Sequence, residues 1–372
     1  MNIVKKGLLS MGEKTEVKQN HYLHMDVLRI IACLMVVFNH TNERGFMRLA
    51  SDELGSASFF LDTFMSTVCK VGVPLFFMMS GALLLGREES LKKTFSRIIR
   101  ILVDLIVFSL LYFWIDTKLV GQEFSLSSTL KMMLSSNYWH LWYLYAYIVF
   151  VISLPVLRKL VKGLDESGAK YLFVLAFVYM AVYPILKVFL SVGINSDLVL
   201  EWLTQDVFIY PILGYAIEKV ISKDYFDKAR LIKLWIANIV CFAIGMVCEY
   251  FFLIKTADDT SGYFDERFLI VFCVLNAVVL YTTVRYIMDH ISVGETAVKV
   301  LTEIGKDTFG IYLLHIWYLW KIPAIFAVWT KIEHTGVFGY HFGILVSCVG
   351  TFILAGITTG VFRRIPVIKK LF

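Results

Sequence analysis

Residues 24–41 are HMDVLRIIACLMVVFNHT, and apolar side chains fill nearly every position between Asp26 and Asn39. Arg29 is the exception inside this run. At about 1.5 Å of rise per residue, a helix over 23–41 is about as long as the ~30 Å hydrocarbon core of a bilayer. The segment therefore predicts a membrane-spanning helix with a charged residue inside it.

Segments of the same kind recur along the 372 residues, of which 58% are hydrophobic and 18% are charged. Soluble proteins carry roughly 25% charged residues, and the mean hydropathy here is +0.70, so a water-soluble fold is excluded. Lipid admits only helices and closed barrels, and the alternating pattern of barrel strands is absent. We therefore expect an all-α fold, a polytopic helical membrane bundle with about ten transmembrane helices. The expected spans are 23–41, 68–86, 101–121, 141–161, 170–192, 205–221, 231–254, 266–289, 308–329 and 340–362.

Lys and Arg residues fall mostly on one side of these spans. If the N-terminus is cytoplasmic, 25 of the 36 Lys and Arg residues lie on that side and ten lie on the other. Because cytoplasmic loops are enriched in these residues, we expect both termini in the cytoplasm. Tails at 1–22 and 364–372 would then flank a transmembrane domain at 23–363. The cations behind the net charge of +6 lie in short loops on one side of the membrane, as topology alone requires. No nucleic-acid partner is therefore expected.

The six cysteines lie within or at the edges of apolar spans. They lack the spacing of a metal site and are most simply small buried side chains. The sequence therefore predicts no metal and no permanently bound cofactor.

The first span holds the strongest pair of functional candidates. Arg29 and His40 are eleven residues apart, three helical turns, so they share one face about 16 Å apart along the axis. Ionisable side chains inside a span cost at least ~2.5–3.5 kcal/mol and are functional candidates for that reason. Asp26, one turn before Arg29, is its natural salt-bridge partner. The spacing also fits a snorkelling Arg and a hydrogen-bonded interfacial His, and it does not choose between these readings.

A second region joins an apolar helix to a basic loop. Ser80 and Gly81 form a small pair that allows close approach of a ligand or of another helix. Arg97 and Arg100 lie on one face of a predicted helix in the next loop, and two guanidinium groups on one face suit a phosphorylated ligand. Anionic lipid headgroups are an equal alternative.

Two further segments gather aromatic and His side chains. Trp139, His140 and Trp142 stand at the predicted outer start of the fourth span, where they fit an aromatic belt or a sugar-binding surface. Tyr312 and His315 share one face at the predicted inner start of the ninth span. Taken alone, His315 fits a buried structural His.

These segments, in this order, resemble the acyltransferase-3 family of bacterial integral-membrane acyltransferases, over essentially the whole chain. The chain departs from the family in Ile30, Ile31 and Ala32, where Gly-Leu-Ala is frequent, and in the split spacing of its two loop arginines. The matching residues are Asp26, Arg29 and His40; Phe76, Phe77, Ser80 and Gly81; Arg97 and Arg100; Trp142, Tyr143 and Leu144; and Tyr312, Leu313 and His315.

The resemblance implies an enzyme in the bacterial cytoplasmic membrane that moves an acyl group, expected to be acetyl, from cytosolic acyl-CoA to a hydroxyl of a surface or lipid-linked glycan. His40 would be the catalytic base, or would carry the acyl group itself, with Arg29 and Asp26 beside it in the mechanism. The expected donor-binding residues are Arg97, Arg100, Ser80, Tyr312 and His315. The expected acceptor-binding residues are Trp139, His140 and Trp142. Acyl-CoA, the glycan and membrane lipids are thus the expected partners.

Two other classes of protein stay open at this point. A transporter or permease-like module also carries polar residues and prolines inside its spans. It would have no need of coenzyme A. A purely structural scaffold would leave Arg29 and His40 without a purpose in lipid.

Overall fold

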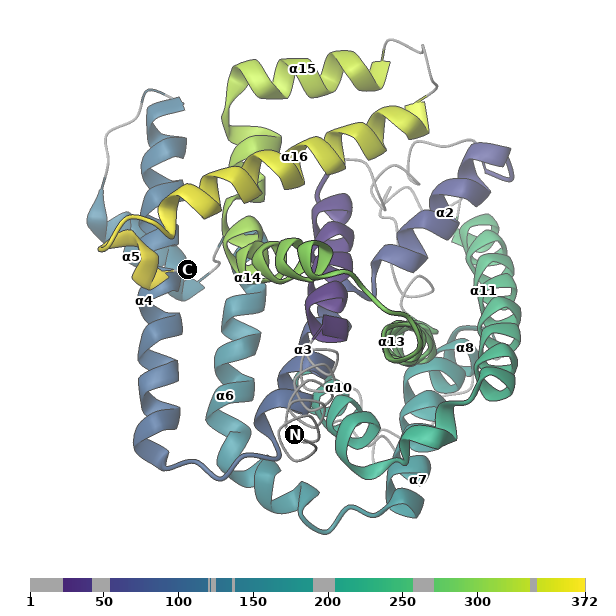
Figure 1. Cartoon of the computed structure of the whole chain (residues 1–372). Helices are drawn as coiled ribbons and strands as arrows, with labels where there is room; N and C mark the ends of the chain where they lie inside the picture. The colour runs from purple at the N-terminus through teal and green to yellow at the C-terminus, as the bar shows by residue number, and fades with distance from the viewer. Residues whose placement is uncertain are drawn as a thin grey trace, which may run out of the picture.

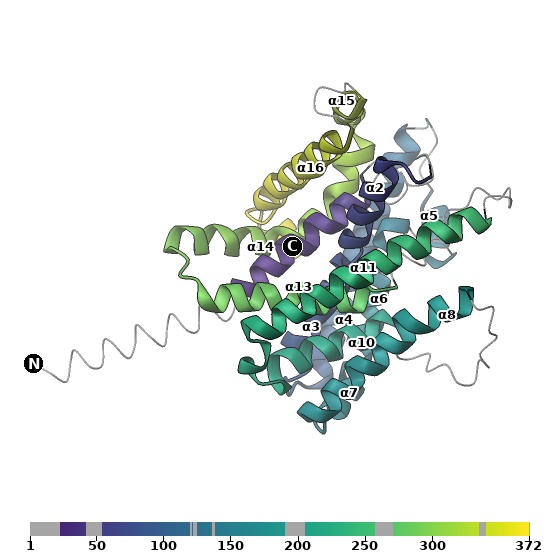
Figure 2. The same cartoon turned by 90° about the vertical axis from the view of Figure 1, so that its right-hand side faces the viewer.

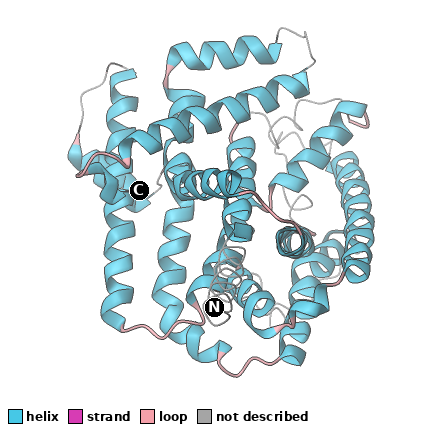
Figure 3. Cartoon of the chain, in the orientation of Figure 1, coloured by secondary structure: helices cyan, strands magenta, loops and turns pink. Residues whose placement is uncertain are grey.

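The computed structural model describes residues 23–41, 54–119, 121, 125–135, 138–189, 205–256, 271–334 and 340–371. Across these ranges the chain consists of helices and the loops that join them, without a strand (Figure 3). The expected all-α fold is therefore confirmed for the described residues. The predicted N-terminal tail at 1–22 lies outside them.

The first helix covers residues 23–39 and is followed by a long series of helical elements along the chain. In order they are α2 Ala57–Cys69, α3 Gly72–Leu84, α4 Leu91–Leu119, α5 Leu126–Ser135, η2 Trp139–Leu141, α6 Trp142–Val161, α7 Glu166–Phe177, η3 Val178–Val182, α8 Tyr183–Phe189, α10 Asp206–Tyr215, η5 Ala216–Val220, η6 Lys223–Phe226, α11 Lys228–Thr256, α13 Cys273–His290, α14 Glu295–Ile316, η7 Trp317–Lys321, α15 Pro323–His334, α16 Tyr340–Phe362 and η8 Ile368–Leu371.

Within the described part of the chain, six helices are long and apolar enough to cross a membrane, and a seventh span is possible as a bent pair. The expected count of ten is thus not confirmed. The segments expected at 23–41, 205–221 and 266–289 are largely helical in their described parts, but these helices are shorter or more polar than such a span requires. The six helices are Ala57–Leu84, Leu91–Leu119, Trp142–Val161, Glu166–Lys187, Lys228–Phe252 and His341–Phe362.

The segment expected to span the membrane at 308–329 is bent in the structure. Glu295–Lys321 and Pro323–Glu333 meet at 77°. Ile322 between them is extended, with φ −102° and ψ 104°. A residue before proline is pushed out of the helical region, and the proline has no N–H to continue the helix. Pro323 therefore ends one helix and starts α15 in a new direction.

Helix 23–39 lies in the middle of the bundle (Figure 1, purple). The Cys33 thiol contacts the Thr308 carbonyl of α14 at 3.5 Å, and the Cys348 thiol of α16 contacts the Leu34 carbonyl at 3.5 Å. On another side, Gly72 of α3 lies so close that a Cβ there would be 2.9 Å from the Ala32 carbonyl oxygen. The expected functional helix is thus enclosed by α3, α14 and α16.

Helices α3 and α10 share the most extensive contact among the labelled helices. A Cβ on Gly81 of α3 would be 1.9 Å from the carbonyl oxygen of Pro211, and one on Gly214 of α10 would be 2.0 Å from that of Met78. Both positions require glycine for this reason. The small Ser80–Gly81 pair therefore serves helix packing at Gly81.

The basic loops gather at one end of the molecule, which we call the inner face. Loop 85–90 lies beside the end of α6, where Lys162 pairs with Glu88 at 2.9 Å, and it shares a cavity with Lys219 of η5. Loop 221–227 shares another cavity with the end of α13. Figure 2 shows the α10–α11 and α13–α14 connections on the left, and α5 and the far ends of α8 and α11 on the right. That the inner face is cytoplasmic stays a prediction from the charges.

Candidate active site

Three histidines that are far apart in the sequence meet inside the bundle. The Nδ1 of His40, just after the first helix, lies 2.6 Å from the Nε2 of His315 in α14. The His140 ring in η2 stands edge-on to the His315 ring, with 6.1 Å between centroids. His140 and His315 are buried. The structure thus brings together a residue expected to be catalytic, one expected to bind the donor and one expected to bind the acceptor.

The hydrogen bonds around His315 assign the protons of the pair. The Nδ1 of His315 lies 2.5 Å from the backbone carbonyl oxygen of Tyr312. Because a carbonyl only accepts, that Nδ1 carries the proton and the Nε2 of neutral His315 is an acceptor. His40 must then donate from its Nδ1 to this Nε2. This leaves the basic lone pair of neutral His40 on its Nε2.

Hydrogen bonds from tyrosine hydroxyls to backbone carbonyls hold the surrounding elements together. The Tyr312 hydroxyl donates to the His140 carbonyl at 2.8 Å, and the Tyr112 hydroxyl donates to the Leu313 carbonyl at 2.8 Å. The Tyr112 ring also packs edge-on to the His140 ring, with 4.5 Å between centroids. These contacts join α4, η2 and α14. Tyr312 therefore has a role in positioning the histidines.

The end of the first helix is fixed by two more contacts. The Trp320 indole donates to the His40 carbonyl at 3.0 Å, and the Asn39 amide donates to the Cys69 carbonyl at 2.9 Å. The first ties the backbone of His40 to η7, and the second ties the neighbouring Asn39 to the break between α2 and α3. These contacts fix the backbone at His40, and the ring itself hydrogen-bonds His315.

A cavity of about 360 Å³ runs along the first helix towards these histidines, and we call it the Arg29 cavity. Arg29 and Arg87 line it near the inner face. Val36 and Tyr312 also line it, each about one helical turn before His40 and His315, respectively. The cavity thus lies between the basic inner face and the paired histidines.

Polar side chains interrupt the apolar wall of this cavity. Ser80 of α3 and Tyr143 and Tyr147 of α6 line it, and both tyrosines hydrogen-bond the Ser80 hydroxyl. The sequence pattern did not single out Arg87 or Tyr147. Arg87 is one of several cations in its loop, and Tyr147 is recognisable only as the residue one turn after Tyr143.

Arg29 stands away from the histidines. Its guanidinium donates to Asp26 at 2.7 Å, as the spacing predicts. With a rise of 1.5 Å per residue, eleven residues separate Arg29 from His40 by about 16 Å. Arg29 therefore lines the inner end of the cavity, where Asp26 pairs with it, and both lie about three to four helical turns from His40.

Arg97 and Arg100, the predicted basic pair on α4, differ in their surroundings. Arg97 makes a two-pronged ion pair with Glu89, which also accepts from Arg158 at 2.8 Å and pairs with Lys93 at 3.1 Å. The hydrogen bond from Arg97, above all, holds the pKa of Glu89 well below its usual range. Arg100 is exposed on the same helix. Arg97 thus anchors loop 85–90 to α4 and α6.

The expected acceptor residues separate in space. His140 is buried, whereas Trp142 is 43% exposed on α6. The side chain of Trp139 lies outside the described residues. Near His140, Lys321 of η7 pairs with Asp116 of α4, and Tyr138 also hydrogen-bonds Asp116. This pair had no signal in the sequence, because its members are distant in the chain. Among the described residues, no group of three or more His, Cys, Asp or Glu side chains is arranged to hold a metal ion.

Comparison with known proteins places the chain in a family. A family model described as an acyltransferase domain, that of the acyltransferase-3 family, matches residues 22–360. No curated protein and no solved structure matches the chain. The match includes the first helix, the Arg29 cavity and all three histidines. The expected resemblance is confirmed: the chain belongs to the acyltransferase-3 family and is a membrane acyltransferase.

Proposed function

We propose that this protein transfers an acyl group, expected to be acetyl, from cytosolic acyl-CoA to a hydroxyl of a cell-surface or lipid-linked glycan, with His40 as the general base. The observation that carries the proposal is the chain of hydrogen bonds from His40 through His315 to the Tyr312 carbonyl. It orients an imidazole whose Nε2 accepts a proton. In a serine-protease triad, a third group likewise fixes the tautomer of the histidine base.

Each bond in the proposed step is accounted for. The Nε2 of His40 takes the proton of the acceptor hydroxyl while the hydroxyl oxygen forms a bond to the thioester carbon. The carbon–sulfur bond then breaks, and the Nε2 of His40 returns the proton to the leaving thiolate. The products are an ester and coenzyme A. The positive charge on His40 in between is stabilised by its Nδ1 hydrogen bond to His315.

The donor fits the Arg29 cavity in this scheme. Arg29 and Arg87 would bind phosphate oxygens, and the pantetheine arm would extend past Ser80 and Tyr147 towards His40. Because Arg29 is about 16 Å from His40 along the helix, we assign it a role in donor binding in this scheme. Arg97 and Arg100 are close enough to interact electrostatically with Tyr147, so they add positive potential at this wall.

The acceptor would approach from the opposite end, past His140. The ion pair between Lys321 and Asp116 lies there with the Tyr138 hydroxyl beside it. Hydroxyl groups of a sugar can donate to a carboxylate and accept from an ammonium group, so this pair suits a glycan. Sugar rings pack well against aromatic faces, so the exposed Trp142 would contact the glycan where it approaches the site.

Release of free thiol from acyl-CoA tests the proposal against a transporter. Purified protein in liposomes made with envelope lipids should release coenzyme A, and His40→Ala should lower the rate of release at least ~100-fold. Trp114→Ala, a change at an exposed position of α4, serves as the control and should keep full activity. Mass spectrometry of surface glycans from cells with and without the protein identifies the acceptor. Thiol release that does not depend on His40, or none from the wild type, would reject the proposal.

A further inference from the structure

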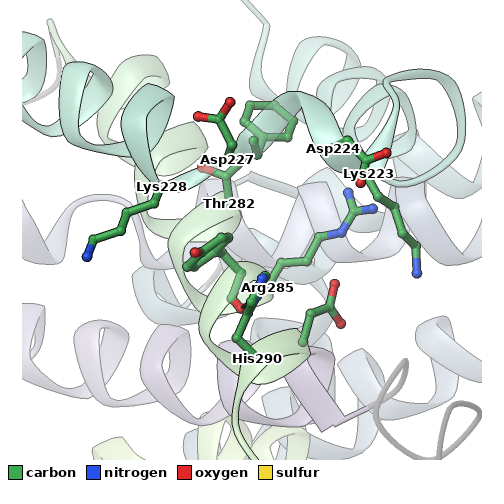
Figure 4. Close-up of a pocket in the computed structure, with 10 residues that line it drawn as sticks. Lys223, Asp224, Asp227, Lys228, Thr282, Arg285 and His290 are labelled. Atoms are coloured by element: carbon green, nitrogen blue, oxygen red, sulfur yellow. Dashed lines mark hydrogen bonds between the residues drawn. The ribbon is translucent and has the colours of Figure 1, made fainter.

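A second cavity, of about 490 Å³, lies at the inner face and is used by no step above. We call it the Arg285 cavity. It is formed by η6, the start of α11 and the end of α13. Figure 4 shows Arg285 extending towards Lys223 and Asp224, with Lys228 on the opposite side. The Arg29 cavity has a different lining, so the two are separate sites.

Arg285 is buried, with 5% of its surface exposed, and its hydrogen bonds are incomplete. One terminal nitrogen donates to the Ile217 carbonyl at 2.5 Å, and its Nε lies 3.8 Å from Glu218. The other terminal nitrogen, Nη2, has no hydrogen-bond partner. A buried guanidinium donor without an acceptor is costly and calls for a ligand that supplies one.

The ion pair with Glu218 leaves one donor of Arg285 unused. The same Glu218 oxygen that faces Arg285 accepts from the His24 Nε2 at 3.0 Å and from the Tyr281 hydroxyl at 3.1 Å. All three contacts fall on this one oxygen, and the other carboxylate oxygen, Oε2, has no hydrogen-bond partner. Glu218 thus does not occupy the Nη2 of the guanidinium, which stays available as a donor for a group in the cavity.

The rim of the cavity adds both signs of charge. Lys223 and Lys228 supply ammonium groups, and Asp224 and Asp289 supply carboxylates. Asp227 also lines the cavity, but its carboxylate accepts from the Arg230 backbone at 2.8 Å and lies 3.7 Å from the Arg230 guanidinium. The cavity thus offers cationic donors together with carboxylate acceptors.

We propose that the Arg285 cavity is a binding site for a phosphate ester that also carries hydroxyl groups. Phosphate oxygens would accept from the buried Arg285 and from the two lysines, because a guanidinium matches phosphate geometry. Hydroxyl groups would donate to Asp224 and Asp289. A phospholipid headgroup and a soluble sugar or glycerol phosphate share this chemistry. The site requires neither coenzyme A nor His40.

Calorimetry with glycerol 3-phosphate tests the soluble source, with glycerol as the ligand that lacks phosphate. The wild type should bind glycerol 3-phosphate and not glycerol. Arg285→Lys loses the forked donor and should weaken binding roughly 10-fold or more. Because Arg285 is buried, the exposed Lys223→Ala/Lys228→Ala double variant provides a second test and should weaken binding to a similar extent. Lys233→Ala, a surface change on α11 outside the cavity, should leave it unaltered.

Native mass spectrometry tests the lipid source on the same variants. Protein taken from nanodiscs containing phosphatidylglycerol should retain that lipid in the wild type and in Lys233→Ala, and lose it in the Lys223→Ala/Lys228→Ala variant. Nanodiscs of phosphatidylcholine alone, which lacks headgroup hydroxyls, are the comparison. Binding in either arm that depends on the cavity residues supports the site and assigns its source. Absence of binding in both arms, or binding equal in all variants, overturns it.

Discussion

His315 stands between His40 and the Tyr312 carbonyl, with 2.6 Å to the first and 2.5 Å to the second. The Tyr312 carbonyl keeps the proton of His315 on Nδ1, so the Nε2 of His315 must accept from His40. This fixes the tautomer of His40, with its proton on Nδ1. His315 acts through His40 and is a positioning residue in this account.

His315→Gln should lower kcat roughly 10- to 100-fold with the KM for acyl-CoA little changed, because the orientation of the base is lost while donor contacts remain. Steady-state kinetics over a range of pH values tests this. The pH profile of kcat should move in the variant, since His40 loses the partner that shares its charge. An unchanged profile with a lower folded fraction would indicate a purely structural role.

Arg29→Ala and Arg87→Ala should each raise the KM for acyl-CoA with kcat mostly intact. Each lost charge-assisted contact of ~1.5–3 kcal/mol corresponds to roughly 10- to 150-fold weaker donor binding. Arg364→Ala, exposed near the C-terminal end, is the matched control. Arg100→Ala, which removes an exposed cation on α4, should have a smaller effect. Wild-type affinity in both cavity variants would show that the donor binds elsewhere.

Gly81→Ala should destabilise the protein by at least ~1–3 kcal/mol, because the added Cβ would overlap the Pro211 carbonyl and force α3 and α10 apart. Gly356→Ala is the control in another helix, since its Cβ would make an ordinary 3.5 Å contact with Ile311. It should be neutral or slightly stabilising. Thermal unfolding in detergent compares the two, and equal melting temperatures would contradict the close packing described here.

Glu89→Gln should lower thermal stability at pH 7 and matter less in acid. The folded pKa of Glu89 is depressed, chiefly by its hydrogen bond to Arg97, so its ionised form stabilises the fold above the unfolded pKa of ~4.3. That stabilisation is lost as the pH falls through the folded pKa. The melting difference between wild type and variant should therefore be constant from pH 6 to 8 and narrow at the lowest accessible pH. A difference that grows in acid would contradict this sign.

Hydropathy predicts most helices here, because apolar length is a local property. It does not give the start of α2 at Ala57, because Asp62 and several hydroxyl residues, which lower the local hydropathy, are buried there against other helices. Nor does it predict the bend, although Pro323 is its visible cause. The expected count of ten is not confirmed, because helices such as α13, buried inside the bundle, are shorter or more polar than a span judged by length and composition requires.

The site was predictable in its parts and not in its arrangement. His40 and His315 were both singled out, but 275 residues separate them, and one sequence gives no distance between them. Arg97 was singled out as a phosphate ligand from its spacing to Arg100. Its partner Glu89 lies across a loop, so the ion pair that occupies Arg97 was not visible in the pattern.

The central claim is that His40 performs proton transfer and does not bind the donor. Its most direct test is to measure kcat and coenzyme A affinity together on purified, folded His40→Ala. The account predicts a loss in kcat of at least ~100-fold, the usual scale of general acid–base help, with the Kd for coenzyme A nearly unchanged. Retained turnover in this variant, or a loss explained by weaker coenzyme A binding, would contradict it.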